Sequence, residues 1–121
     1  MTKDHFHIIK LGGTIEFFDP AYDAINKKLL KLDSTIDSYL HNLVKPHFNF
    51  STESVSEKDS RDITEEDRNK LLKAVQTASH DNIIITHGTF TMRETAEFLA
   101  GKIPAGKRIV LTGSMIPPYG L

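Results

Sequence analysis

The chain has 121 residues, which is close to the usual size of one domain. Hydrophobic residues make up 39% of it and charged residues 26%, as in globular proteins with a real core and unlike disordered or membrane-spanning chains. Lysine and arginine number 15 against 16 acidic residues, so no overall positive field favours nucleic-acid binding. Cysteine is absent, which excludes disulfides, thiolate catalysis and cysteine-ligated zinc.

The first apolar run, residues 6–11, is interrupted by His7 and Lys10 and is too short for a secretion signal or a membrane span. We therefore expect a cytoplasmic protein with neither a membrane nor a nucleic acid as its partner.

The first half of the chain predicts two strands around one helix. Residues 5–11 form a partly alternating apolar run that ends in Gly12-Gly13, which indicates a short buried strand and a tight turn. Ser34 can cap a helix with apolar residues at helical spacing, and Pro46 ends it. Residues 48–55 alternate and are rich in aromatic and β-branched side chains, which is typical of a second strand.

The second half alternates helix and strand more clearly. Thr64–Asp67 is a near capping box that opens a helix with one apolar face. The three consecutive isoleucines of residues 82–86 predict a strand buried on both faces of a parallel sheet, and residues 108–112 repeat this pattern. Between these strands, a helix follows His87-Gly88-Thr89 and ends before Pro104.

This alternation predicts an α/β fold: three α/β/α layers around a doubly wound, mostly parallel sheet of the flavodoxin or Rossmann-like type. We expect one domain over residues 1–121, apparently truncated at its C-terminus because the last strand lacks a following helix. The charge-dense stretch 53–70 is expected to be mostly solvated loop and outer helix face. Uncovered apolar surface around Ile109, Leu111, Met115 and Ile116 favours a homo-oligomer.

Candidate site residues gather where strands end. In open parallel sheets, ligands bind outside the carboxyl ends of the strands, where successive crossovers go to opposite faces. If the strand order reverses next to the first strand, Thr14 and Thr89 share one crevice, which Gly13 and Gly88 let a ligand approach closely. A helix N-terminus after Thr89 would add donors for a carboxylate or an oxyanion. The alternatives are structural: a simple turn, a helix cap at Thr89, or loop closure by Ser60.

A threonine nucleophile needs a base, and the candidates by position are Tyr22, Asp62, Lys10 and His87. The six histidines form no His-Glu-x-x-His motif, and His5 and His7 are expected to decorate one strand face. We therefore predict no metal site and no cofactor.

Three segments occur in one order along the chain: the turn 12–15 (Gly-Gly-Thr-Ile), the segment 85–96 (Ile-Thr-His-Gly-Thr-x-Thr-Met-x-Glu-Thr-Ala) and the segment 110–115 (Val-Leu-Thr-Gly-Ser-Met). Together they resemble the bacterial-type L-asparaginase family. Residues 58–64 resemble its substrate-binding serine loop, as it occurs in short, single-domain asparaginase-like proteins. The resemblance implies an N-terminal asparaginase-type domain.

The resemblance also implies roles in a two-step amide hydrolysis. Thr14 would attack the side-chain amide of asparagine, form an acyl-enzyme and release ammonia. Thr89 would orient water and help to bind the oxyanion. Ser60, with the backbone near Arg61, would hold the α-carboxylate of this small amino-acid or amide substrate, and Tyr22 would match the family's lid tyrosine.

Two departures from the family pattern imply a poor asparaginase. The family has an aspartate that binds the α-amino group and belongs to a Thr-Lys-Asp relay, whereas this chain has Phe90. The relay lysine corresponds to a point beyond the end of this sequence. Loss of a positioned proton-transfer group typically slows a reaction by about a hundredfold to ten-thousandfold.

Three hypotheses follow. The first is an asparaginase-type amidohydrolase, with altered amide specificity because of Phe90. The second is a catalytically impaired homologue that binds a small ligand or contributes to an assembly. The third, a nucleotide-binding module, rests on fold analogy alone, and neither Gly-x-Gly-x-x-Gly nor a P-loop is present.

Overall fold

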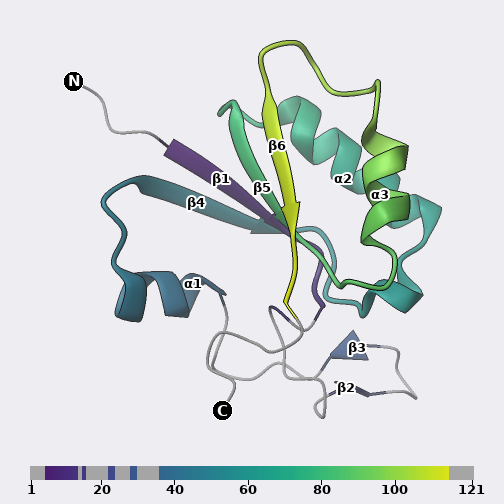
Figure 1. The fold of residues 1–121 in the computed structure, drawn as a ribbon, viewed down its shortest axis with the longest axis horizontal. Coiled ribbons are helices and arrows are strands. Elements are labelled where there is room, and N and C mark those ends of the chain that lie inside the picture. The colour runs from purple at the N-terminus through teal and green to yellow at the C-terminus, as the bar shows by residue number, and fades with distance from the viewer. Residues whose placement is uncertain (1–4, 14, 16–21, 24–27, 30–35, 115–121) are drawn as a thin grey trace.

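The computed structural model describes residues 5–13, 15, 22–23, 28–29 and 36–114. Four strands form a parallel sheet in the order β4-β1-β5-β6: β1 (His5–Lys10), β4 (Asn49–Ser54), β5 (Asn82–Thr86) and β6 (Arg108–Thr112). Two short strands, β2 (Tyr22–Asp23) and β3 (Lys28–Leu29), form a separate antiparallel pair (Figure 1). The predicted α/β class with a doubly wound parallel sheet is confirmed.

The strand order defines where a ligand would bind. After β1, the chain forms β4 on one side of it and then β5 and β6 on the other side. The order reverses between β1 and β5. The segments that leave the carboxyl ends of these two strands therefore emerge side by side at the switch point.

The helix α2 (Glu65–Thr77) begins as the sequence predicts. The Thr64 hydroxyl accepts a hydrogen bond from the Asp67 amide at 3.2 Å, and the Asp67 carboxylate accepts one from the Thr64 amide at 2.9 Å. This reciprocal capping box satisfies two amides that the helix itself leaves without partners.

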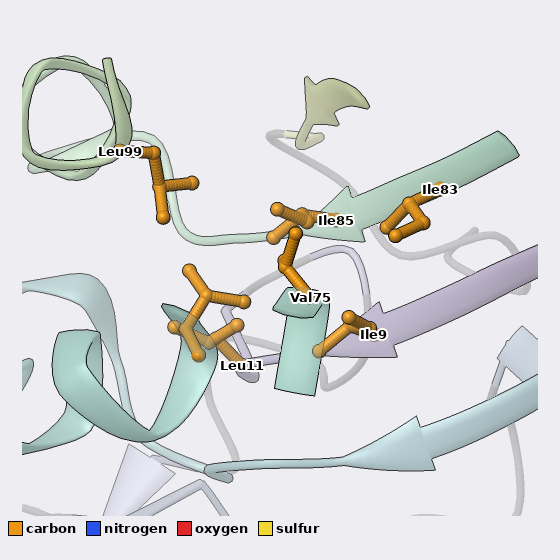
Figure 2. Packing of buried hydrophobic residues seen from close by; sticks show 7 residues of the cluster. Ile9, Leu11, Val75, Ile83, Ile85 and Leu99 are labelled. Atoms are coloured by element: carbon orange, nitrogen blue, oxygen red, sulfur yellow. The ribbon is translucent and has the colours of Figure 1, made fainter. Parts of the chain in front are cut away.

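The core lies between one face of the sheet and the helices α2 and α3 (Met92–Leu99), as Figure 2 shows. Leu71 and Val75, four residues apart on α2, are fully buried against alternate residues of β1 and β5. Such spacing places both side chains on one helix face. The buried cluster comprises Ile9, Leu11, Leu71, Val75, Ile83, Ile85 and Leu99.

The opposite face of the sheet carries α1 (Ile36–Tyr39). Asp37 accepts hydrogen bonds from Lys10 at 2.7 Å and from Thr52 at 2.5 Å, both from strand positions that alternate with the core positions. Helices therefore cover both faces, as predicted. The sequence suggested one regular helix up to Pro46, but residues Leu40–Val44 form a π-helical turn that a bond from the Lys45 amide to the Leu40 carbonyl closes at 2.8 Å.

The expectation about uncovered apolar surface is wrong for Ile109 and Leu111. Both are partly buried and pack against the core cluster, because their side chains face α2 and α3. Val110 between them points to the other face and is 60% exposed. It lines a hollow of about 590 Å³ together with Phe6, Ile84 and four other residues. Met115 and Ile116 lie outside the described residues.

The stretch 53–70 is also less solvated than its charge predicts. Asp59, Ser60 and Asp67 are all buried. Asp67 forms an ion pair with Lys58 at 2.9 Å in addition to its capping hydrogen bonds. Partners of this kind offset the free-energy cost of burying a carboxylate. This stretch therefore belongs partly to the interior.

Candidate active site

The loops that follow β1 and β5 touch each other through two glycines. Gly13 has φ +86°, and a Cβ there would lie 2.4 Å from the Gly88 nitrogen, so no side chain fits between the two backbones. The Leu11 amide donates to the Thr86 carbonyl at 3.0 Å, which continues the pairing of the strands into the loops. Thr14, the residue after Gly13, lies outside the described residues.

Ser60 ties a third loop to the same place. It opens the 3₁₀ turn η3 (Ser60–Asp62), and its hydroxyl oxygen accepts from the amides of Phe90 at 2.9 Å and Thr91 at 3.4 Å. The Thr91 hydroxyl donates to the Ser60 carbonyl at 2.7 Å. A Cβ on Gly88 would lie 2.7 Å from the Ser60 Cβ, so this glycine too is required by close contact.

The start of α3 corrects one expectation. The N-cap of the helix is Thr91, so the reading of Thr89 as a cap is wrong. The amides of Phe90 and Thr91, which precede the first helical residue Met92, donate to Ser60. Thr89 itself is exposed, and its methyl group lies beside Gly113, which follows β6.

His87 is locked in the interior next to this junction. It is fully buried, and because a carbonyl can only accept, its Nδ1 donates to the Gly88 carbonyl at 2.6 Å. Its Nε2 then accepts from the Thr95 hydroxyl at 2.8 Å, and Thr95 accepts from Arg68 Nε at 3.0 Å. Burial lowers the pKa of His87 and keeps its ring neutral. With both nitrogens occupied, His87 is a structural residue and not the base that its position suggested.

The other base candidates lie in different surroundings. Lys10 pairs with Asp37 on the α1 face of the sheet. Asp62 is half-buried in η3. The backbone of Tyr22 lies in β2, and its side chain is outside the described part of the chain.

Arg61, Asp59 and Phe90 form a unit that sequence reasoning did not find. Arg61 donates from Nε and a terminal nitrogen to the two oxygens of Asp59, at 2.8 and 3.0 Å, and its amide donates to the same carboxylate. This hydrogen bonding lowers the pKa of Asp59. The guanidinium carbon also lies 4.8 Å from the centre of the Phe90 ring. The two-residue spacing of Asp59 and Arg61 was the available signal, but only the fold brings Phe90 to them.

His5 and His7 lie on one strand face, as predicted, and both bond the Ser51 hydroxyl, at 2.9 and 2.7 Å. In the part of the chain that the structure describes, no three histidine or acidic side chains come together as a metal-binding group. No helix within these ranges is long and apolar enough to cross a bilayer.

Comparisons with known proteins support the resemblance. The family model "Asparaginase, N-terminal" matches residues 5–120. A Haemophilus influenzae protein named "Probable L-asparaginase periplasmic" is 34% identical over 114 residues, which cover 91% of this chain and 32% of that protein. "L-asparaginase 2" of Bacillus subtilis is 30% identical over 123 residues, which cover 93% of this chain and 32% of that protein.

Among solved structures, a "Probable Cytoplasmic L-asparaginase from Campylobacter jejuni" superposes with a TM-score of 0.75 at 32% identity. The match covers 95% of this chain and 36% of that one. The chain thus spans about a third of the length of the relatives it matches. From the family match, the shared sequence and the shared fold, we conclude that the chain belongs to the asparaginase family.

Proposed function

We propose that this chain supplies the catalytic threonines of an asparaginase-type amidohydrolase, which converts the side-chain amide of L-asparagine or a related amide into the acid and ammonia. The observation that carries the proposal is the contact between Gly13 and Gly88 at the switch point of the sheet. Thr14 and Thr89 each directly follow one of these touching glycines in the sequence. The names of the relatives point to the same reaction.

The proposed mechanism has two steps. In the first, the Thr14 oxygen attacks the amide carbon and its proton passes to the amide nitrogen. The resulting oxyanion then collapses to an ester on Thr14 as the carbon–nitrogen bond breaks and ammonia leaves. In the second, a water held by Thr89 attacks the ester, which releases the acid and restores the hydroxyl. Tyr22 completes the proposed catalytic set. The Gly13 amide already donates to the Lys58 carbonyl at 3.1 Å, so an oxyanion donor has to come from another group.

Ser60 and Arg61 are proposed to hold the substrate carboxylate. Both lone pairs of the Ser60 hydroxyl already accept from amides, so the group it can offer a ligand is its proton. The Arg61 guanidinium adds a positive charge beside it. Ser60 is only 1% exposed, so a bound carboxylate requires the covering residues to move aside.

Ammonia release tests this proposal. Asparagine, glutamine and amides without a free α-amino group are each offered to the wild-type chain. We expect weak turnover that Thr14→Val and Thr89→Val abolish, whereas Arg93→Gln, on the outer face of α3 with an 87% exposed side chain, leaves it unchanged. No ammonia from any amide, with folded protein, overturns the proposal.

Phe90→Asp sharpens the same test. A carboxylate at position 90 supplies the charge partner that the α-ammonium of asparagine otherwise lacks, and such partners contribute on the order of 2 to 5 kcal/mol to binding. Asparagine turnover should therefore rise. No gain in a variant with intact fold and ligand binding contradicts the assignment of Phe90 to the substrate site.

The exposed ring of Phe90 favours a second candidate, a small-ligand-binding or assembly module with impaired catalysis. This candidate predicts a ligand-dependent rise in unfolding temperature without product, because binding to the folded state alone stabilises it.

A cytoplasmic location and a homo-oligomer belong to the proposal as well. The names of the relatives point to both the cytoplasm and the periplasm. The 60% exposed Val110 offers apolar surface for association. Cell fractionation and sedimentation velocity at several protein concentrations test these two points.

A further inference from the structure

The charge at the rim between η3 and α3 is set by Arg61. Asp59 is the nearest buried acid, but both of its oxygens bind Arg61 and its side chain is only 6% exposed. Asp67, the buried acid in the first turn of α2, is paired with Lys58 and Thr64. Neither carboxylate presents an open oxygen to a ligand, whereas half of the Arg61 side chain is exposed.

Phe90 presents an aromatic surface beside this charge. The residue is 65% exposed, and the Arg61 guanidinium lies 4.8 Å from its ring centre, an arrangement in which the cation is attracted to the ring. The Phe90 amide donates to the Ser60 hydroxyl at 2.9 Å. The ring is therefore joined to Ser60 by its own backbone, and Asp59 fixes the guanidinium above it.

These contacts define what a ligand at this rim would meet. A carboxylate near Ser60 would find a hydroxyl proton and the positive charge of Arg61. An ammonium on the neighbouring carbon would find an uncharged ring and carboxylates that other residues already occupy. It would also meet the positive end of the Arg61–Asp59 ion pair, because the Asp59 side chain is only 6% exposed and the Arg61 side chain is 51% exposed. Two like charges about 5 Å apart change an equilibrium by about fourfold in bulk water and by more than about a hundredfold at the effective dielectric constant of a protein surface. Because Asp59 offsets part of the Arg61 charge, we expect an effect of about tenfold, between these limits.

We propose that Arg61 is a specificity-determining residue, and that the site selects amides of carboxylic acids in which the amino group is acylated or absent over free amino-acid amides. This inference rests on the proposed function, because it names the substrate class of that site. An acyl or unsubstituted carbon fits against the Phe90 ring, and the carboxylate lies towards Ser60 and Arg61.

Binding of the product acids tests the inference independently of turnover. Isothermal titration calorimetry on the whole chain with succinate, N-acetyl-L-aspartate and L-aspartate compares an absent, an acylated and a free amino group on one carbon skeleton. We expect the first two acids to bind at least about tenfold more tightly than L-aspartate. Equal or tighter binding of L-aspartate overturns the inference, as does failure of all three acids to bind.

Variants then assign the selectivity to Arg61. Arg61→Gln should weaken succinate binding and bring the ratio of the succinate and L-aspartate affinities close to one, whereas the matched control Arg93→Gln should leave the ratio unchanged. Arg61→Gln leaves Asp59 without its partner, so circular dichroism accompanies it. If it does not fold, Phe90→Asp takes its place and should shift the ratio towards L-aspartate. An unchanged ratio in folded Arg61→Gln contradicts the role of Arg61, and an unchanged ratio in folded Phe90→Asp contradicts the position of the amino group against the ring.

Ammonia release separates this inference from the proposed function. Succinamate and N-acetyl-L-asparagine should be hydrolysed faster than L-asparagine. If the acids bind with the expected preference but none of these amides releases ammonia, the hydrolytic function fails and the selectivity of the site stands. If ammonia is released from L-asparagine faster than from the other two, the selectivity fails and the hydrolytic function stands.

Discussion

Two polar clusters, one on each side of the sheet near the carboxyl ends of its strands, differ in how completely they are hydrogen-bonded. The loop cluster consists of Ser60, His87, Thr91 and Thr95, and its side chains bond amides, carbonyls and one another. The strand cluster on the α1 side consists of Lys10, Asp37, Thr52 and Thr86. There, Lys10 and Thr52 share Asp37, but the buried Thr86 hydroxyl has no hydrogen-bond partner among the residues that the structure describes.

The loop cluster holds its part of the fold to one geometry, and the strand cluster does not. An incompletely bonded cluster costs free energy without fixing positions, whereas a completely bonded one allows few alternatives. Residues 87–91 are therefore held by bonds from η3 and α3. The strand cluster has no comparable constraint on Thr86.

We expect the largest change in the free energy of unfolding from a side chain that separates Gly13 from Gly88, beside the loop cluster. Gly13→Ala places a Cβ 2.4 Å from the Gly88 nitrogen at φ +86°. We expect a loss of about 3 kcal/mol or more in the free energy of unfolding, measured by urea denaturation. Gly101→Ala is the matched control, because Gly101 has φ +79° but nothing within 4 Å of its Cβ position. It should cost only the strain of the left-handed backbone, about 1 to 2 kcal/mol. Equal losses would mean that the contact with Gly88 contributes nothing.

An intermediate effect comes from pH, which acts on the loop cluster through His87. Burial lowers its pKa below the ordinary value of 6.5, so the folded chain keeps it neutral while the unfolded chain takes up a proton. The stabilisation is complete above pH 6.5 and is lost as the pH falls towards the folded-state pKa. Urea denaturation at pH 7.5 and 5.5 should show a loss of about 1 kcal/mol from this residue. His87→Gln, although less stable at both pH values, should show a smaller difference between them.

Carboxylates do not account for a change in this pH window. Arg61 lowers the pKa of Asp59 below its ordinary value of 3.8, so its stabilising charge is present above that pH and is lost only as the solution becomes more acidic. An undiminished pH difference in His87→Gln would therefore assign the effect to another histidine, such as His5, whose pKa is lowered by burial and by His80 and His7.

The smallest expected effect comes from the strand cluster. Thr86→Val replaces the unpartnered hydroxyl by a methyl group of similar size, and valine suits a strand. Because no hydrogen bond is lost, the free energy of unfolding should stay within about 1 kcal/mol of the wild type, with a gain in stability expected. Thr95→Val, which removes the hydroxyl between His87 and Arg68, is the contrasting variant and should destabilise. A larger loss in Thr86→Val than in Thr95→Val would reverse the comparison.

The fold was predictable because its signals are local. The isoleucines of β5 and the Thr64 capping box act over a few residues, and the sequence shows them directly. The π-helical turn was not predictable, because the apolar spacing of residues 36–44 fits an ordinary helix equally well. The burial of Asp59 depends on its ion pair with Arg61, and the number of charged residues in 53–70 does not reveal this pairing.

The candidate site was predictable only in part. The strand ends identified Gly13, Gly88 and Ser60, which the structure brings together. The bonds that join Ser60 to residues 90 and 91 span about thirty positions, and no pattern in the sequence reports a contact at that separation. For the same reason, Phe90 was identified as a missing charge, whereas its pairing with Arg61 emerged only from the fold.

The bonds through His87 have an electronic consequence. All of them run in one direction: Arg68 donates to Thr95, Thr95 to His87, and His87 to the Gly88 carbonyl, so a guanidinium polarises every link. The last acceptor shares its peptide group with the Thr89 nitrogen. Electron density drawn onto that carbonyl oxygen makes the Thr89 N–H more acidic, and a partly buried arginine thereby strengthens a proton donor in the loop that follows β5.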